Sequence, residues 1–315
     1  MPVAPAMIDV DALEDQLERA LAANLGFLPV AEPPPSFRAR SRSPQSPQRA
    51  QKEEVGPPTY RWDASASPIG GALFEGRVDD ARAGLADALR RRRQDGDPEA
   101  EARLFAQRFW LVLEWGDEDE QYGLLDECRR RAYTHGEVVW RGALTVLLAH
   151  LGRRDEAVRD LEATVAECEA LAPTACWLDV VTNLAEAAFL LGDVERARTL
   201  HKWLANLPDQ LVVVGPGDVC KGSLRRFQAH VAAVVGASAD ADEGFRSAAD
   251  AHRALGARPL LARTLHQWGR SLAGRDDLLA RRCLQEAEDL TDELGLPGRA
   301  GTAGPRGDCP VSTPA

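Results

Sequence analysis

The stretch that most resembles a nucleotide-binding motif is Gly215-Pro-Gly-Asp-Val-Cys-Lys-Gly-Ser223. Glycines, a lysine and a hydroxyl group are the residue types that cradle phosphates. Their order differs from that of a phosphate-binding loop, because Lys221 precedes the last glycine. Gly269-Arg-Ser271 begins like a nucleophile elbow, but it lies in a helical pattern and lacks the second glycine. We therefore expect an inter-repeat loop at residues 215–223 and ordinary helix at 269–271.

Histidine and cysteine spacing gives little support for metal chemistry. The six histidines form neither a His-Glu-x-x-His motif nor a pair four residues apart, which are common arrangements of zinc ligands. The six cysteines include no Cys-x-x-Cys pair. We expect reduced thiols, no metal and no cofactor.

Paired helices are the elements that would position any site, and residues 151–171 show their pattern well. A helix ends near Leu151, Gly152 supplies the turn, and Asp155 and Glu156 begin the next helix, where carboxylates favour the helix dipole. Turn glycines recur at intervals of 36 to 44 residues along the chain: Gly76, Gly116, Gly152, Gly192, Gly236 and Gly274.

This repeat predicts an all-α fold. One helical hairpin cannot bury its apolar face alone, so neighbouring hairpins stack and share a core. Tetratricopeptide repeats have about 34 residues and run longer when their helices are extended. We predict a tetratricopeptide-like, right-handed α-solenoid of about six helical hairpins over residues 66–297, with Leu211–Val214 as the one candidate strand. Small alanines are expected where the two helices of a pair meet: Ala81, Ala157, Ala197 and Ala241. Larger apolar residues are expected in the layer between neighbouring pairs: Leu161, Leu200, Phe245 and Leu284.

The first helix of each pair lines the concave surface of such an array. Aligning the turns predicts a groove that is acidic in the middle and basic toward its C-terminal end. Such a groove would suit a peptide or a partner helix that carries both signs of charge; the alternative is an ordinary solvated polar face. The residues assigned to it are Arg103, Trp110, Glu114, His150, Asp179, Thr182, Glu186, Arg226, His230, Arg263, His266 and Arg270.

Three further segments flank the repeats. Residues 1–30 are expected to hold a short amphipathic helix over 8–25, because apolar residues recur there at helical spacing. Residues 31–65 are rich in proline, serine and arginine and are expected to form a linker. Residues 298–315 are rich in glycine and proline and are expected to form a disordered tail.

Charge and hydropathy exclude several classes of partner. A net charge of −11 repels nucleic acid and anionic membranes, so we expect no direct nucleic-acid binding. The apolar runs fall far short of the ~20 residues of a membrane helix. We therefore expect a soluble cytoplasmic protein whose partner is a protein or peptide segment; the sequence leaves its oligomeric state open.

Residues 190–297 contain short sequence segments typical of one family. These are Val212–Ser223, Phe245–Pro259 with Leu-Gly-Ala-Arg-Pro at its end, Leu261-Ala-Arg-Thr264, and the terminal Glu-Leu-Gly295. The region resembles the C-terminal tetratricopeptide region of large actinobacterial ATPase regulators, which include LuxR-type activators and proteins with class III nucleotidyl cyclase domains. The resemblance implies a sensor and assembly arm. It does not carry over ATPase activity or DNA binding, because no Gly-x-x-x-x-Gly-Lys-[Ser/Thr] motif or helix-turn-helix is present.

Three functional hypotheses follow. The first is a non-catalytic scaffold that binds a protein or peptide in the groove, in a regulatory setting. The second is a sensor of a small molecule or signal peptide in a transcriptional regulatory system. The third is an enzyme that uses the groove, with His230, His266, Asp179 and Glu186 as acid–base groups.

Overall fold

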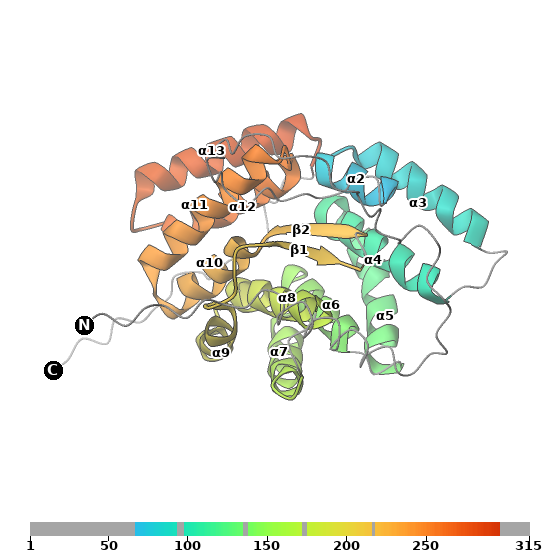
Figure 1. Ribbon diagram of the computed structural model, residues 1–315, viewed down its shortest axis with the longest axis horizontal. Helices are drawn as coiled ribbons and strands as arrows, with labels where there is room; N and C mark the ends of the chain where they lie inside the picture. Colours follow the sequence, from blue (N-terminus) through green and yellow to red (C-terminus); the bar gives the residue numbers. More distant parts are fainter. Residues whose placement is uncertain (1–66, 93–97, 135–137, 172–174, 216–217, 297–315) are drawn as a thin grey trace, which may run out of the picture. The chain divides into compact units, whose positions relative to one another are not determined.

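The computed structural model describes residues 67–92, 98–134, 138–171, 175–215 and 218–296, all within the unit Tyr60–Ala315 (Figure 1). These residues contain twelve helices and two strands, so the prediction of a mostly helical chain is confirmed. The predicted helix at 8–25, the linker at 31–65 and the tail at 298–315 lie outside the described residues.

Each helix of the N-terminal half contacts the next one along the sequence from α2 to α9, and contacts between consecutive helices continue to the last described helix. The eight helices of this half are α2 (Pro68–Glu75), α3 (Val78–Arg92), α4 (Pro98–Trp115), α5 (Glu118–Thr134), α6 (Val138–His150), α7 (Arg154–Cys168), α8 (Ala175–Leu191) and α9 (Val194–Leu204).

The C-terminal half begins with a β-hairpin and continues with four more helices. Figure 1 shows the hairpin between α8 on one side and α2 on the other, in agreement with the contacts of its strands. The elements are β1 (Leu211–Val214), β2 (Val219–Ser223), α10 (Leu224–Val235), α11 (Ser238–Ala254), α12 (Arg258–Leu272) and α13 (Asp277–Glu293).

Local sequence explains where several helices begin and end. Asp193 caps α9 by accepting a hydrogen bond from the Arg196 backbone N–H at 3.0 Å, and this satisfies a donor that the first helical turn leaves unpaired. The turn at Gly152 is confirmed, because α6 ends at His150, α7 begins at Arg154, and Gly152 has a φ of 68°. A left-handed residue of this kind ends a helix at little steric cost only when it is glycine.

The apolar positions behave largely as the repeat predicts. The four alanines expected between paired helices are fully buried, and so are Leu161, Leu200 and Phe245. The prediction for Leu284 is wrong: this side chain is 36% exposed. It lies on α13, the last helix of the described chain, so no later described helix follows to cover it.

The hairpin is the exception to the all-α prediction. Leu211–Val214 is indeed a strand, but it pairs antiparallel with Val219–Ser223, which the sequence assigned to a loop. Strand β2 has no period-two pattern because every one of its residues is buried. The register shifts between Val212 and Val213, and Gly222 takes a φ of 92°.

The first described helix lies beside the hairpin and beside a helix near the far end of the sequence. Helix α2 contacts both β2 and α12. At Gly70 the approach is so close that a Cβ atom would lie 2.3 Å from the Asp218 carbonyl oxygen. Gln107 of α4 donates to the Ser67 hydroxyl at 2.6 Å, which joins the same corner. The hairpin is therefore enclosed by helices from both ends of the described chain.

No helix among the described residues is long and apolar enough to span a bilayer.

Candidate functional site

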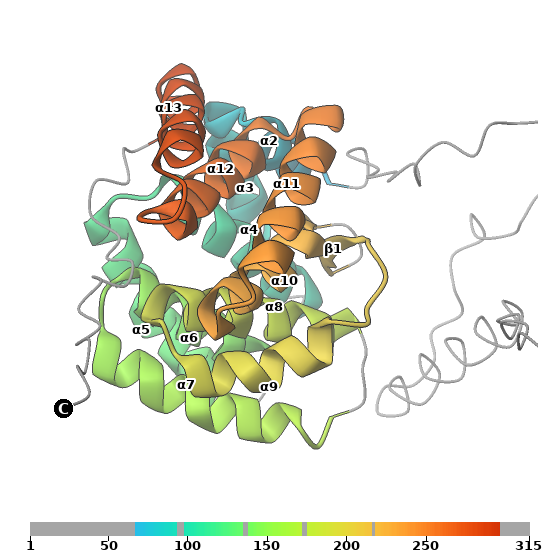
Figure 2. The same ribbon diagram turned by 90° about the vertical axis from the view of Figure 1, so that its left-hand side faces the viewer.

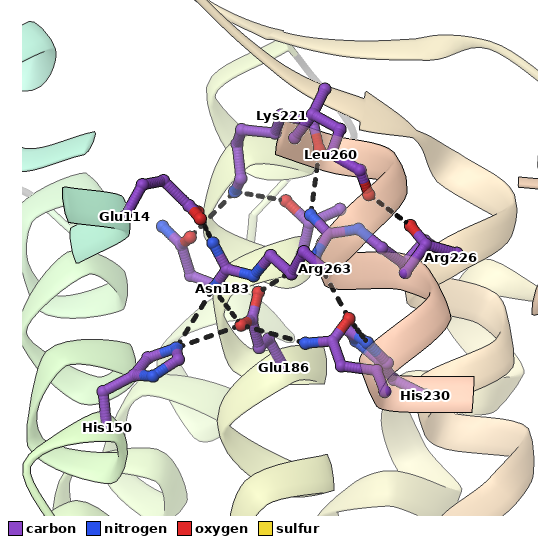
Figure 3. Close-up of polar contacts among 12 residues, drawn as sticks. Glu114, His150, Asn183, Glu186, Lys221, Arg226, His230, Leu260 and Arg263 are labelled. Carbon is purple, nitrogen blue, oxygen red and sulfur yellow. Dashed lines mark hydrogen bonds and ion pairs between the residues drawn. The ribbon is translucent and has the colours of Figure 1, made fainter. Parts of the chain in front are cut away.

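Charged and polar side chains from five helices meet in the interior of the helical array (Figure 3). Helical spacing brings them inward, because residues three and four apart share one face of a helix. We call this group the polar cluster; it consists of Glu114 of α4, His150 of α6, Glu186 of α8, Arg226 and His230 of α10, and Arg263 and Gln267 of α12.

Glu186 stands at the centre of the polar cluster and is 1% exposed. Its Oε1 atom lies 3.0 Å from His150 Nε2 and 3.4 Å from Gln267 Nε2, and it also accepts from Arg263. Its Oε2 atom lies 3.7 Å from Arg226 Nη1. Burial alone would raise the pKa of Glu186, but the hydrogen bond to His150 and the charge of Arg226 hold it far below its usual range. The carboxylate is therefore charged at neutral pH.

Two guanidinium groups balance the two carboxylates of the polar cluster. Arg263 pairs with both Glu114 and Glu186 and lies with its Cζ atom 5.9 Å from the centre of the Trp110 ring. Arg226, which is 0% exposed, also donates from Nη2 to the Lys221 carbonyl oxygen at 2.9 Å. A buried charge needs such partners, because desolvation costs several kcal/mol per ion.

His150 sits between a carboxylate and a guanidinium. Its Nε2 atom lies 3.0 Å from Glu186 Oε1 and 3.1 Å from Arg263 Nη2. Protonated at Nε2, the ring donates to the carboxylate; deprotonated there, it accepts from the guanidinium. The tautomer of His150 thus decides whether its Nε2 atom hydrogen-bonds to Glu186 or to Arg263.

His230 is a neutral histidine inside the polar cluster. Burial lowers its pKa to about 4, although the Glu186 charge opposes this shift. Its Nε2 atom donates to Gln267 Oε1 at 2.9 Å, and its ring stacks on Phe189 with centroids 4.6 Å apart. Its Nδ1 atom has no hydrogen-bond partner among the described residues.

A second buried group, the lysine site, adjoins the polar cluster. Lys221 of β2 is 0% exposed, and its Nζ atom has four oxygen atoms within hydrogen-bond distance. These are the Asp179 carbonyl oxygen at 3.0 Å, Asp179 Oδ1 at 2.9 Å, Thr182 Oγ1 at 2.7 Å and Asn183 Oδ1 at 2.8 Å. The lysine that resembled a phosphate ligand in the sequence therefore ties the hairpin to α8.

An open cleft of about 430 Å³ lies beside the polar cluster, between α8, α12 and α13. His150 and Gln267 belong to both the cleft wall and the polar cluster, so the cleft borders directly on the buried charges. The rest of the wall is mostly apolar, with Arg270 and Arg281 as its cations and Asp277 as its carboxylate. Its lining residues are His150, Phe189, Leu190, His266, Gln267, Gly269, Arg270, Ser271, Ala273, Asp277, Ala280, Arg281 and Leu284.

A smaller cleft of about 330 Å³ lies between α9, α10 and α11. His201, Arg225, Asp240 and Glu243 give it a more polar wall. Gln228 donates to the Leu204 carbonyl oxygen at 2.7 Å, so part of this wall already serves the end of α9.

The predicted groove residues are brought together, but not as an open groove. Charges expected to face a ligand are instead buried and pair with one another, as Glu186 does with Arg226 and Arg263. Of the twelve predicted residues, His150, His266 and Arg270 line the cleft, and Arg103 is exposed on α4 outside both buried groups. The other eight are buried or nearly buried: Trp110, Glu114, Asp179, Thr182, Glu186, Arg226, His230 and Arg263.

The four candidate acid–base residues do not form one catalytic group. Asp179 belongs to the lysine site, Glu186 and His230 are buried in the polar cluster, and only His266 lines the cleft. Gly269-Arg-Ser271 lies within α12, as expected. Among the described residues, no group of three His, Cys, Asp or Glu side chains is placed to hold a metal ion.

The sequence reading missed the apolar half of the cleft. Phe189 and Leu190 follow Glu186 by three and four residues on α8, and that spacing could have placed them on the same face. Leu284 could not be found in this way, because it was expected to be buried between repeat units.

No protein-family model, curated protein or solved structure matches this chain. The resemblance to actinobacterial ATPase regulators accordingly stays a prediction.

Proposed function

We propose that this protein is a non-catalytic, tetratricopeptide-like repeat scaffold that binds a protein or peptide segment in the cleft between α8, α12 and α13, in a regulatory setting. The observation that carries the proposal is the open, mostly apolar cleft of about 430 Å³ with two arginines in its wall. Ligand pockets commonly have volumes of about 300–1,000 Å³ and combine an apolar wall with a few polar groups.

The buried charges support a scaffold more than an enzyme. A general acid or base must come within hydrogen-bond reach of its substrate. Glu186 and His230 are 1% and 0% exposed and already hold partners in the protein. Their arrangement suits a rigid wall behind the cleft, because each charge in the polar cluster fixes the helix opposite it.

The volume and the apolar wall of the cleft also favour a second candidate, a small-molecule sensor. Phe189 and Leu284 offer apolar contacts, and Arg281 offers a cation to an anionic group. A sensor would respond to a small ligand by changing its stability or compactness, whereas a scaffold would recognise a chain segment.

Selection of peptides from a random displayed library tests the proposal. The immobilised intact protein is expected to enrich peptides, and Ala273→Phe, which fills the cleft from an exposed position, is expected to weaken their binding at least about tenfold. Ala205→Phe is the matched control, because Ala205 is also an exposed residue after a helix but lines the smaller cleft.

No enrichment, or peptides that bind both variants as they bind the intact protein, would overturn the proposal. Peptides lost only from Ala205→Phe would move the binding site to the smaller cleft.

A further inference from the structure

Helix α13 exposes two leucines around one arginine. Leu278 is 57% exposed and Leu284 is 36% exposed, and each lies three residues from Arg281. Residues at this spacing lie close together on a helix surface. Figure 2 shows α13 at the margin of the helices, with α12 beside it.

This row is continuous with the cleft. Arg281 and Leu284 line the cleft itself, and Leu278 extends the apolar surface beyond Arg281. Within the array, the apolar face of each helix is covered by its neighbour, as α12 and α13 cover each other. Exposed leucines at the end of such an array present the kind of surface that another amphipathic helix covers.

The charges around this surface identify the kind of helix. The cleft wall carries Arg270, Arg281 and one carboxylate, Asp277, although the whole chain has a net charge of −11. Arg281 forms no ion pair with any described residue. It is therefore available to a carboxylate on the partner, and this favours an acidic ligand.

We infer that the partner segment is an acidic amphipathic α-helix, which lays its apolar face over Leu278 and Leu284, inserts one large apolar side chain into the cleft, and directs a carboxylate to Arg281. This inference rests on the proposed function and specifies its ligand. Helices that bind in grooves use apolar anchors at positions i, i+3, i+4 and i+7, a spacing that fits a row along α13.

A charge-swap experiment tests the inference. The probe is a fluorescein-labelled synthetic peptide of 18 residues with leucines at helical spacing and glutamates on the flanking positions; a second probe replaces every glutamate with lysine. Fluorescence anisotropy measures the Kd of each probe for the full chain. The glutamate peptide is expected to bind at least about tenfold more tightly than the lysine peptide.

Three variants locate the contact. Arg281→Glu is expected to weaken the glutamate peptide about tenfold and to strengthen the lysine peptide. Arg282→Glu makes the same charge change on an exposed neighbour outside the cleft and is expected to leave the order of the two peptides unchanged. Leu278→Ser is expected to weaken the glutamate peptide without loss of helicity, because this side chain is 57% exposed in the folded protein.

Circular dichroism of the mixture provides the conformational readout. Binding is expected to add helical signal beyond the sum of the protein and the free peptide. Equal affinity for both peptides, equal effects of Arg281→Glu and Arg282→Glu, or binding without added helix would each overturn the inference. If library peptides bind the cleft but are neutral or extended, the proposed function stands and the inference fails.

Discussion

Glu186 holds a negative charge where water does not reach it. Its carboxylate is satisfied by His150, Arg226, Arg263 and Gln267, which come from three other helices. Such a site adds little net stability compared with an apolar core, but the loss of one partner leaves the others buried and uncompensated. The polar cluster thus makes the packing of α6, α8, α10 and α12 depend on one another.

Replacement of Glu186 by glutamine tests this dependence. We expect Glu186→Gln to lower the free energy of unfolding by about 3–5 kcal/mol, because Arg226 and Arg263 lose a buried negative partner. Urea denaturation followed by circular dichroism measures the change.

Glu195→Gln is the control for this substitution. Its side chain is 82% exposed and pairs with Arg196 at the surface, so we expect a loss below about 1 kcal/mol. Similar losses in the two variants would contradict the role given to Glu186.

At the scale of elements, the β-hairpin connects parts of the array that are distant in sequence. Lys221 ties β2 to α8 through Asp179, Thr182 and Asn183. The Ser223 backbone N–H donates to His252 Nε2 of α11 at 2.9 Å, and His252 Nδ1 lies 3.1 Å from Thr264 Oγ1 of α12. Since Nε2 accepts, His252 is neutral with its proton on Nδ1.

Gly222 is the residue that lets β2 approach α11. We expect Gly222→Ala to destabilise the protein by about 2–4 kcal/mol, because φ is 92° and the added Cβ would lie 2.4 Å from His252 Nε2. Thermal and urea denaturation measure the loss.

Gly152→Ala separates strain from contact. Gly152 also has a positive φ, 68°, but a Cβ there meets nothing within 4 Å, so we expect a loss of only about 1–2 kcal/mol. An equal loss at both glycines would show that the close approach of the added Cβ atom at residue 222 to His252 does not contribute to the loss of stability.

At the scale of the whole molecule, buried histidines couple stability to pH. Burial lowers the pKa of His230 to about 4 and, together with the charge of Arg226, lowers that of His252 to about 3. Below the ordinary histidine pKa of about 6.5, the unfolded chain takes up protons that the folded protein does not. Stability therefore falls as the pH drops below about 6.5.

We expect the free energy of unfolding to decrease steadily from pH 7 to pH 5, with His230 contributing up to about 3 kcal/mol by pH 4. Glu186 adds to this loss only below about pH 4.5, where the glutamate takes up a proton in the unfolded chain but stays charged in the folded protein because its pKa is lowered. Urea titrations at several pH values measure the slope.

His230→Gln assigns the slope to its source. This variant removes one titrating group and keeps a side-chain donor near Gln267, so we expect a shallower dependence on pH. His201→Gln on α9, which lies outside the polar cluster, is the control and should keep the slope of the intact protein. A slope unchanged by His230→Gln would mean that His230 binds protons equally in the folded and the unfolded protein.

Much of the helical architecture is determined locally and could be predicted from the sequence. Gly152 and Gly236 mark turns because a left-handed residue is least costly as glycine, and buried alanines such as Ala157 and Ala197 recur because paired helices approach closely. Helical spacing also selected most residues of the polar cluster, since a face is defined by steps of three and four residues.

The tertiary structure decided which of those polar faces remain open. Arg263 meets Glu186 and His150 across 77 and 113 residues of sequence, and no local pattern predicts that their charges will cancel. The pairing of β2 with β1 and the burial of Lys221 against α8 depend in the same way on distant partners. Periodicity determines the face on which a side chain lies; only the packing of the helices and the hairpin determines whether water, a ligand or another side chain meets it there.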